Sequence, residues 1–382
     1  MEGKRLIEKI KLRNILSFGD KGEEIELQPL NVIIGQNASG KSNLVDVIKL
    51  LRSLPQDKGL ADFISKNGGI GEWFWKGKKE SENAIIGIAF NEISTNYEIE
   101  LRNHPLFGLF ILDEKIKISN ETTSLVSFNR KQIISSEAPN EEFSFDDSVL
   151  GKFLSITIDE EKYSFYFISF ILRRMKIYSD LETNRKSEIR KPQILDAKKS
   201  FLAEDGSNLS LVLNELERKG NIKDIIIENL RKFYSQIKDY SFEFTSEYIQ
   251  FYLRENLEKP ISAMRLSDGT LRYLCLLAIL CHPEPPPLIC IEEPETGLHP
   301  DILPTIAELM KDAATRTQLI VTTHSDILVS AFSDMPEAVL VCEKDEDGTH
   351  FKRLEAENLK TWLEEYTLGE VWLRGGIGGT RW

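Results

Sequence analysis

The sequence predicts an α/β protein with a parallel or mixed sheet, an antiparallel β subdomain and a helical insertion. Three observations point to this fold class. A short apolar strand passes through a glycine-containing turn into an amphipathic helix within residues 30–51. Apolar and polar residues then alternate with period two from about 80 to 160. A polar, largely helical stretch follows from about 173 to 260, and strands and helices alternate again from residue 261.

These patterns divide the 382 residues into three segments. Residues 1–160 are expected to form the first part of the main lobe, with the glycine turn and an antiparallel meander. Residues 161–260 are expected to form a mostly helical insertion or lid that contains a basic segment. Residues 261–382 are expected to complete the main lobe. The length suits two to three domains, or one large domain with an insertion.

Apolar spacing predicts the individual elements in chain order. Residues 5–55 are expected to form strand, turn, strand, strand and helix. Four period-two runs predict the meander, namely NAIIGIAF, NYEIELRN, FILDEKIKIS and SLVSFNRKQIIS. Helical stripes at 209–216 and 222–233 precede a β pair at FEFTSEYIQFYL. The last segment is expected to hold the helices 271–282 and 301–314, the strands LICIEE and TQLIVTTH, and a hairpin over 338–353.

Charge and composition exclude several classes of protein. The formal charge of −13 argues against a general nucleic-acid coat, because non-specific binding depends on neutralising phosphates. A bilayer span needs about twenty apolar residues, so the short apolar runs predict no membrane span. The N-terminus has no apolar secretory region, and we expect a cytoplasmic protein. The cysteines fit no metal spacing and are expected to be buried thiols: Cys275, Cys281, Cys290 and Cys342.

The glycine turn GQNASGKS matches the pattern G-x-x-x-x-G-K-[ST] between a strand and a helix. Backbone N–H groups in such a turn point inward as a nest for phosphate oxygens, and the helix N-terminus adds positive charge. Lys41 would neutralise the β and γ phosphates, and Ser42 would offer its hydroxyl to Mg²⁺. A plain strand–helix turn is the alternative. The expected nucleotide-binding residues are Gly35, Asn37, Ala38, Ser39, Gly40, Lys41, Ser42 and Asn43.

Three further patterns stand at places where a parallel sheet binds ligands. Glu292 and Glu293 end an apolar strand and point in opposite directions, so that Glu292 suits the metal and Glu293 suits the attacking water. His324 follows the strand QLIVTT and could donate to a γ-phosphate. The segment LSDGT places Ser267 and Gly269 at a helix start, which is a second anion site by the same dipole argument. Their alternatives are a solvated turn, a structural histidine and an ordinary N-cap.

Together, in this order, the four motifs resemble those of the ABC-type ATPase family. The segments LSDGTLRYL, IEEPETGLHP and TTHS are similar to the RecF, SMC and OLD branch, and to the compact bacterial ATPases of the AAA15/AAA21-like group. The opening LRNILSFGDKGEEIELQPLNVIIGQNASGKSN and the tail YTLGEVWLRGGIGGTRW are similar as well. The resemblance extends over nearly the whole chain and is weak between 75 and 200.

The resemblance implies an ABC-ATPase head that binds ATP and Mg²⁺ and hydrolyses ATP. Two copies would meet head to head, with Ser267 and Gly269 of one copy completing the γ-phosphate shell of the other. It implies roles for Glu293 as the catalytic glutamate, Glu292 as the metal-side acid and His324 as the switch histidine. It places Arg13 and Asn14 near the nucleotide, and the D-loop at LHP, residues 298–300.

The chain departs from the family pattern at three points. Position 292 is Glu where many members have Asp, and no glutamine stands out as the Q-loop, for which Gln193 is a candidate. Ser267 follows Lys41 by 226 positions (267 − 41), which leaves room for a large insertion and argues against a transporter subunit.

Three functions compete: an ATP-driven switch in DNA repair, chromosome maintenance or phage defence with a partner effector, an OLD-like nuclease, and an ATP-binding scaffold with little turnover. A nuclease would need a metal-binding domain, and 58 residues after His324 (382 − 324) are few for one. Glu343 and Asp345–Asp347 could begin such a domain, but a charged hairpin turn explains them more simply.

DNA is a further candidate binding partner. Residues 173–199 hold nine basic residues against four acids, a local excess of five that could meet phosphates. A solvated face or a contact with an acidic partner subunit explains the same charges. The nine are Arg173, Arg174, Lys176, Arg185, Lys186, Arg190, Lys191, Lys198 and Lys199.

Overall fold

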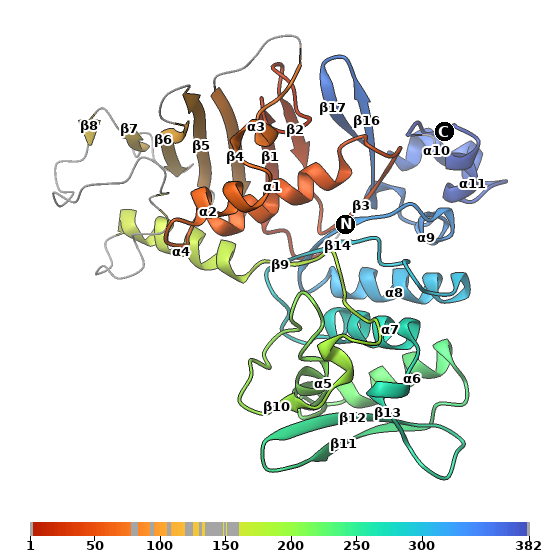
Figure 1. Cartoon of the computed structure of the whole chain (residues 1–382). Helices are drawn as coiled ribbons and strands as arrows, with labels where there is room; N and C mark the ends of the chain where they lie inside the picture. Colours follow the sequence, from red (N-terminus) through yellow and green to blue (C-terminus); the bar gives the residue numbers. More distant parts are fainter. Residues whose placement is uncertain are drawn as a thin grey trace.

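The computed structural model describes residues 3–77, 83–91, 95–104, 108–118, 125–129, 132–133, 148, 150 and 160–379. Its elements form an elongated molecule, with a seven-stranded sheet at one end and a small four-stranded sheet at the other (Figure 1). A six-stranded sheet lies between them and contains the predicted glycine turn. The α/β class, the mixed sheet and the antiparallel subdomain are therefore as predicted.

The six-stranded sheet is parallel over five strands and ends in an antiparallel hairpin. In spatial order the strands are β17 (Gly348–Arg353), β16 (Val339–Asp345), β3 (Leu30–Gly35), β15 (Gln318–Thr322), β14 (Leu288–Glu292) and β9 (Lys176–Tyr178). The hairpin β16–β17 turns at Asp345–Gly348, as the sequence predicts.

Both faces of this sheet are buried, which is why its strands are short continuous apolar runs. Alternate residues enter different cores: Ile289 and Ile291 of β14 pack with the helices that follow, whereas Leu288 and Cys290 pack toward α1. The strands β3, β15 and β16 divide their side chains in the same way. The sheet is thus a rigid partition between two hydrophobic cores, and the ends of its strands are fixed relative to one another.

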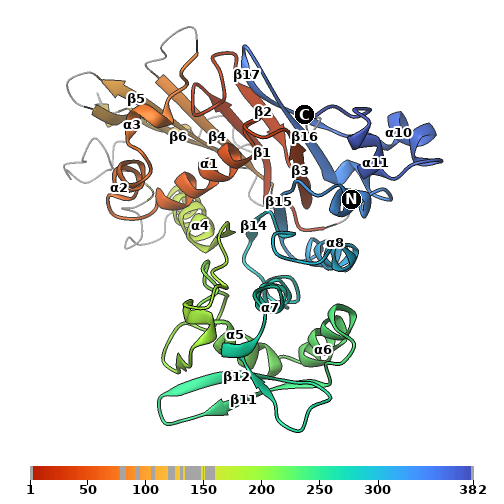
Figure 2. The ribbon, with the colours of Figure 1, turned by 45° about the vertical axis from the view of Figure 1, so that its right-hand side comes forward.

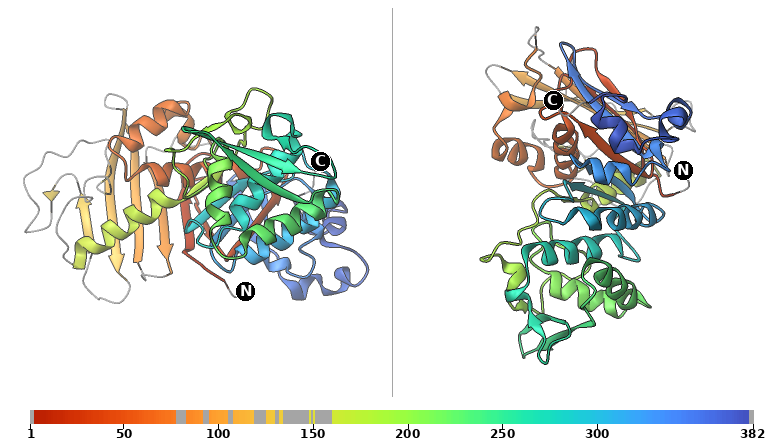
Figure 3. Two further views of the ribbon diagram at one scale, coloured as in Figure 1. Left: turned by 90° about the horizontal axis from the view of Figure 1, so that it is seen from below. Right: turned by 90° about the vertical axis from the view of Figure 1, so that its right-hand side faces the viewer.

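The seven-stranded sheet is the predicted meander, extended by two N-terminal strands. Its order is β2 (Glu23–Glu26), β1 (Ile7–Arg13), β4 (Asn83–Phe90), β5 (Thr95–His104), β6 (Gly108–Ile118), β7 (Leu125–Asn129) and β8 (Gln132–Ile133). The helices α1 (Lys41–Ser53) and α4 (Glu160–Arg174) cover it (Figure 3). The short helices α2 (Gly59–Lys66) and α3 (Ile70–Trp73) complete this end.

The insertion ends in the small sheet β10 (Gln193–Ile194), β12 (Tyr248–Arg254), β11 (Asp239–Phe244) and β13 (Ile261–Ser262). The helices α5 (Leu209–Glu217) and α6 (Ile222–Phe233) pack on it, as their apolar stripes predict. The 3₁₀ turns η2 (Glu188–Arg190) and η3 (Ala263–Arg265) lie at its junction with the main lobe.

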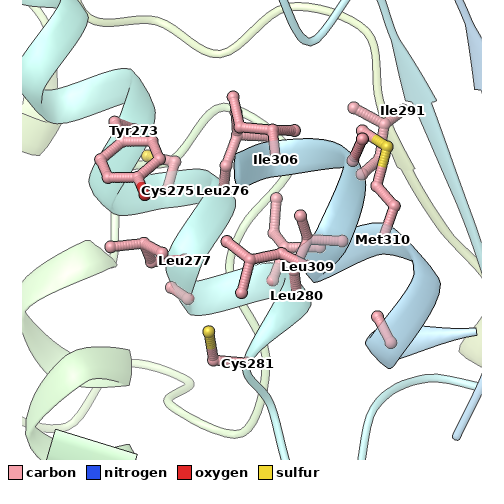
Figure 4. Packing of buried hydrophobic residues seen from close by; sticks show 14 of the residues in the cluster. Tyr273, Cys275, Leu276, Leu277, Leu280, Cys281, Ile291, Ile306, Leu309 and Met310 are labelled. Atoms are coloured by element: carbon pink, nitrogen blue, oxygen red, sulfur yellow. The ribbon is translucent and has the colours of Figure 1, made fainter. Parts of the chain in front are cut away.

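Helix α7 (Asp268–Leu280) joins the insertion to the main lobe. It is apolar nearly all round, and Leu276 and Leu280 pack toward Ile306 and Leu309 of α8 (Leu303–Ala313), which follows the 3₁₀ turn η4 (Pro300–Ile302) (Figure 4).

The four cysteines are free and buried, as predicted. Burial raises the pKa of the Cys281 thiol to about 12 and that of the Cys342 thiol to about 11, so both are thiols at neutral pH.

The C-terminal helices α10 (Ala356–Leu363) and α11 (Leu368–Leu373) follow the hairpin (Figure 2). Helix α11 packs against α9 (Asp326–Ser330), which begins directly after the segment that contains His324. Between α9 and β16 lies the 3₁₀ turn η5 (Pro336–Ala338). Within the described ranges, no helix is long and apolar enough to cross a membrane.

Residues 175–208 differ from the helical expectation. They form β9, the turn η2, β10 and irregular connections, and β9 pairs in parallel with β14 of the main sheet. A strand of three residues is too short to show a period, which is why sequence patterning missed it. Parts of the predicted run SLVSFNRKQIIS and most of 134–159 lie outside the described residues.

Candidate nucleotide site

The glycine turn runs from the end of β3 into α1 and has the backbone that its glycines permit. Gly40, the N-cap residue of α1, has φ +111°, and Gly35 has φ +153°. A Cβ on Gly40 would stand 2.3 Å from the Thr349 Oγ1, and one on Gly35 would stand 2.2 Å from the Cys342 carbonyl oxygen. The turn is therefore held against β16 and β17. The exposed residues Gln36–Ala38 leave its outer side open.

Lys41 folds back over this turn. Its Nζ donates to the carbonyl oxygens of Gly35, at 2.8 Å, and Gln36, at 2.7 Å. Burial lowers the pKa of Lys41, while the nearby Cys342 and Glu293 side chains oppose that change. A buried cation whose close contacts are carbonyl oxygens favours an anionic ligand, because the ligand would replace the water that burial removes.

Strand register brings the predicted motifs to one edge of the sheet. Thr322 lies beside Ile33 of β3, and Glu292 lies beside Thr322. The glycine turn, the histidine segment and the two glutamates therefore leave three adjacent parallel strands at their carboxyl ends, where open α/β sheets bind ligands.

Glu292 points into the protein at the end of β14. Its Oε1 accepts a 2.5 Å hydrogen bond from the Ser179 hydroxyl and lies 3.3 Å from the Nζ of Lys49 on α1. Lys49 also pairs with Asp46 at 3.0 Å. Burial would lower the pKa of Lys49, but Asp46 and Glu292 outweigh it, so the pKa is raised. Ser179 and Lys49 belong to no local motif, so the sequence alone does not indicate either of them.

Glu293 points the other way, toward solvent. It has a left-handed backbone with φ +46°, and its N–H donates to the Thr322 carbonyl at 2.9 Å. One carboxylate oxygen lies 3.8 Å from the His324 Nε2, and the other accepts from the Thr296 hydroxyl at 3.4 Å. Non-glycine residues seldom adopt this backbone, and strain of this kind is common at active sites. An exposed carboxylate beside an imidazole can orient and deprotonate a water molecule.

Glu295 holds the segment that contains His324. Its Oε1 accepts from the Thr323 hydroxyl at 2.7 Å and from the backbone N–H of His324 at 2.8 Å. Its other oxygen, Oε2, is buried without a hydrogen-bond partner among the described residues. Nothing in the sequence signals this contact beyond the acidic residue itself, because the two segments are 28 residues apart.

Ser267 caps α7 and faces solvent. Its hydroxyl accepts from the Thr270 N–H at 3.0 Å and bonds to the Thr270 hydroxyl at 2.7 Å. A Cβ on Gly269 would stand 2.9 Å from the Gly297 carbonyl oxygen, so this helix start lies against the segment before the predicted D-loop. These contacts join the LSDGT segment to the 293–300 turn rather than to the glycine turn.

Arg13 and Asn14 end β1 and begin a tight turn. The Arg13 Nε donates to the Asp20 carbonyl at 2.8 Å, and the side chain is exposed. Asn14 is buried with φ +54°, and its amide donates to the Asn83 carbonyl at 3.0 Å. Its Oδ1 lacks a partner within the described ranges.

Ser17 joins this tight turn to the glycine turn. The Thr349 hydroxyl bonds to both the Ser17 hydroxyl and the Ser39 carbonyl oxygen, each at 2.7 Å. Both turns therefore contact the same residue of β17, Thr349.

Gln193 lies in the small sheet of the insertion and not in the sheet that contains β3, β14 and β15. It pairs with Ile249 in the small sheet, and its Oε1 accepts from the Leu211 N–H at 3.2 Å. The residue that reaches Glu292 from the end of β9 is Ser179.

The basic residues of segment 173–199 do not form one exposed surface. Arg190 is buried, Arg174 stacks over Phe170 and Phe201, and Lys191 and Lys199 pair with acids. Arg185, Lys186 and Lys198 are exposed.

The candidate nuclease acids belong to the hairpin. Asp345 accepts from the N–H groups of Asp347, at 2.7 Å, and Gly348, at 3.1 Å, as a turn aspartate does. The Glu343 Oε1 accepts from the Gly379 N–H at 2.8 Å. Hydrogen bonds within the turn therefore account for Asp345, and a contact with the C-terminal segment accounts for Glu343.

Magnesium suits the residues at the sheet edge. Ser42 supplies a hydroxyl at the first turn of α1, and Glu292 supplies a carboxylate, the oxygen ligands that this ion prefers. No cluster of three or more His, Cys, Asp or Glu side chains with metal-binding geometry occurs in the part of the chain that the structure describes.

Solved structures of SMC heads share this fold. The SMC head bound to the C-winged-helix domain of ScpA has a TM-score of 0.59 and 15% identity, over 92% of this chain and 99% of that one. The Pyrococcus furiosus head with an extended coiled coil, bound to the C-terminal domain of ScpA, gives 0.59 and 15%, over 94% and 99%. The Pyrococcus yayanosii head gives 0.52 and 16%, over 94% and 99%. No curated protein matches the chain.

A family model also matches residues 30–330, from the start of β3, the strand that leads into the glycine turn, to the end of α9. Its description is "AAA domain, putative AbiEii toxin, Type IV TA system". The chain therefore belongs to this AAA domain family, and it shares the fold of SMC heads.

Proposed function

We propose that the protein is an ATP-driven molecular switch, in which two copies bind ATP and Mg²⁺ head to head and then hydrolyse it. The meeting of the glycine turn, the paired glutamates and His324 at the ends of three adjacent strands is the observation that carries this proposal. The chain belongs to an ATPase family, which supports hydrolysis in general terms.

Each residue has a role that its position supports. The turn 35–42 would cradle the phosphates, and Lys41 would leave its two carbonyl partners to neutralise them. Mg²⁺ would neutralise charge on the phosphates, held through Ser42 and Glu292. Glu293 would deprotonate the attacking water, and His324 would hold the γ-phosphate end of the site.

We infer a second copy from the exposure of Ser267 and Asp268 in the LSDGT segment. Ser267 presents its hydroxyl at the N-terminus of a thirteen-residue helix, while its neighbour Gly269 lies against the 293–300 region of the same chain. The N–H groups of a helix start suit a γ-phosphate. Pairing two copies would bring Ser267 and Gly269 to the partner's nucleotide.

The partners and the biological role are proposed from the comparisons and from the exposed basic residues. The family description names a toxin of a toxin–antitoxin system, and two of the similar SMC heads are bound to ScpA domains. We therefore propose a protein effector as a partner, in DNA maintenance or phage defence, with DNA as a candidate ligand of the exposed residues Arg185 and Lys186.

Phosphate release and nucleotide binding, measured on three proteins, test the enzyme itself. The wild type should release phosphate with Mg²⁺ and ATP. Lys41→Ala should bind ATP about 10- to 150-fold more weakly, since it loses a charged hydrogen bond. Glu293→Gln should bind ATP normally and hydrolyse it about 10²- to 10⁴-fold more slowly. Turnover in Glu293→Gln equal to wild type would contradict the role of this residue.

A scaffold with little turnover is the second candidate. The engagement of Glu292 by Lys49 and Ser179 favours it, because both contacts compete with a metal for the same carboxylate oxygen. ATP binding by the wild type without measurable phosphate release, with or without DNA, would select the scaffold over the switch.

A further inference from the structure

We propose that Arg190 is the positioning residue of the LSDGT segment: its guanidinium fixes the backbone on which Ser267 meets the second copy's nucleotide. This inference rests on the proposed function and adds a residue to it. It differs from the interpretation of Arg190 as part of a basic surface, because the side chain is only 5% exposed.

The guanidinium lies between two irregular segments of the chain. Its Nε donates to the carbonyl oxygens of Thr183 and Asn184, each at 3.0 Å. One terminal nitrogen donates to the Leu266 carbonyl at 2.6 Å and lies 3.4 Å from those of Ala263 and Met264. The other pairs with the Asp268 carboxylate.

These contacts lie on both sides of Ser267. Leu266 and Ser267 are extended, with ψ of 154° and 156°, and α7 begins at Asp268. The carbonyl before Ser267 and the carboxylate after it are both held by the same planar group. The serine itself is exposed, so its direction depends on this buried anchor rather than on packing of its own side chain.

Arginine suits this place for a geometric reason. A guanidinium has five N–H donors in one rigid plane, so it can serve backbone carbonyls and a carboxylate at once. A lysine would keep the charge and the contact with Asp268 but could not serve both segments in fixed directions. Removing the group would leave buried carbonyl oxygens without a donor.

The same stretch of chain also reaches the nucleotide edge. Ser179 bonds to Glu292 at 2.5 Å, eleven positions before Arg190 (190 − 179), and β9 precedes it directly in the main sheet. The segment 179–190 therefore ties the metal-side acid to the LSDGT segment. Arg190 lies at the end of this segment that is farther from Glu292. Through this segment, the main sheet would fix the direction in which the Ser267 side chain points.

The test uses the full chain in a Glu293→Gln background, in which ATP persists. Arg190→Lys should bind ATP within about twofold of its parent, since the glycine turn is untouched. It should need at least about tenfold more protein to dimerise with ATP. Asp268→Asn, at a side chain 64% exposed, should shift dimerisation in the same direction by a smaller factor. Lys232→Ala, at an exposed position on α6, is the matched control and should dimerise as the parent does.

Amide hydrogen exchange on the nucleotide-free monomers separates positioning from folding. Arg190→Lys should speed exchange at residues 263–270 and leave 30–51 unchanged. The proposal is overturned if Arg190→Lys dimerises like its parent, or if exchange rises equally across the chain. Should Arg190→Lys fail to fold, normal dimerisation of Asp268→Asn overturns it. A parent that stays monomeric with ATP contradicts the proposed function instead.

Discussion

Glu295 holds a segment that it does not belong to, the one that contains the proposed switch residue His324. It holds the Thr323 hydroxyl and the His324 N–H on a single oxygen. We predict that Glu295→Ala slows ATP hydrolysis by about 5- to 150-fold, the kinetic equivalent of the roughly 1–3 kcal/mol that removal of a buried polar partner costs. ATP affinity should stay within about twofold.

The conservative variant distinguishes positioning from stability. Glu295→Gln keeps an acceptor oxygen and should restore most of the rate, with melting temperature measured alongside phosphate release. An equal loss of rate in both variants, with unchanged melting temperature, would mean that the negative charge matters rather than the acceptor.

Residues in contiguous motifs were predictable from sequence, and those that act through tertiary contacts were not. Lys41, Ser42, Glu292 and Glu293 lie in short patterns whose chemistry follows from spacing. Ser179, Lys49 and the contacts of Glu295 appear only when β9, α1 and β14 are placed together. Arg190 resembles a surface charge in the sequence, since burial of a single arginine leaves no pattern there.

At the scale of elements, the glycine turn depends on two neighbouring strands for its shape. We predict that Gly40→Ala lowers stability by at least about 1–3 kcal/mol, the usual cost of backbone strain at a position of this kind, and abolishes ATP binding. Its Cβ would also meet the Thr349 hydroxyl at 2.3 Å. Thermal unfolding and nucleotide titration measure the two effects.

Gly71→Ala is the matched control for this substitution. It lies in the short helix α3, has no atom within 4 Å of an added Cβ, and should change stability by less than about 1 kcal/mol. Normal ATP binding by Gly40→Ala would contradict the account of the turn.

Element types were predictable where apolar periods are long. The meander, the helices α5 and α6 and the hairpin β16–β17 agree with their patterns. The three-residue strand β9 and the short helices α2 and α3 were missed, because one or two turns show no clear period. The division at residues 160 and 260 stays a prediction.

At the scale of the whole molecule, His350 links the two large sheets. Its Nδ1 lies 3.0 Å from Glu23 of β2 and its Nε2 lies 3.2 Å from Asp345 of β16. Burial alone would lower the pKa of His350, but the two carboxylates outweigh it, so the pKa is raised. A raised pKa means that the charged histidine stabilises the fold fully below about pH 6.5, the ordinary value, and that this stability is lost as pH rises through the folded pKa.

We therefore predict that His350→Gln lowers the melting temperature more at about pH 5.5, below the ordinary histidine pKa, than at about pH 8.5, well above it. Unfolding of both proteins is followed across that range by circular dichroism. A deficit that is the same at both ends of the range, or larger at the alkaline end, would rule out a charged link between the sheets.

The overall charge of −13 limits contact with DNA to a local surface. We predict that reversal of Arg185 and Lys186 to Glu reduces the salt dependence of DNA affinity by a slope of about 2, or roughly 0.9 for each phosphate that is no longer neutralised. Fluorescence anisotropy with labelled duplex between about 50 and 200 mM salt measures it. An unchanged slope would exclude these residues from a DNA site.

The central claim is that ATP joins two copies through the exposed serine at the start of α7. Light scattering of Glu293→Gln with Mg²⁺ and ATP tests it most directly. The account predicts a mass near twice the 43.7 kDa of one chain, returning to one chain when Ser267→Arg is added, with ATP still bound. A mass of one chain in saturating ATP, or a dimer that Ser267→Arg leaves intact, would contradict it.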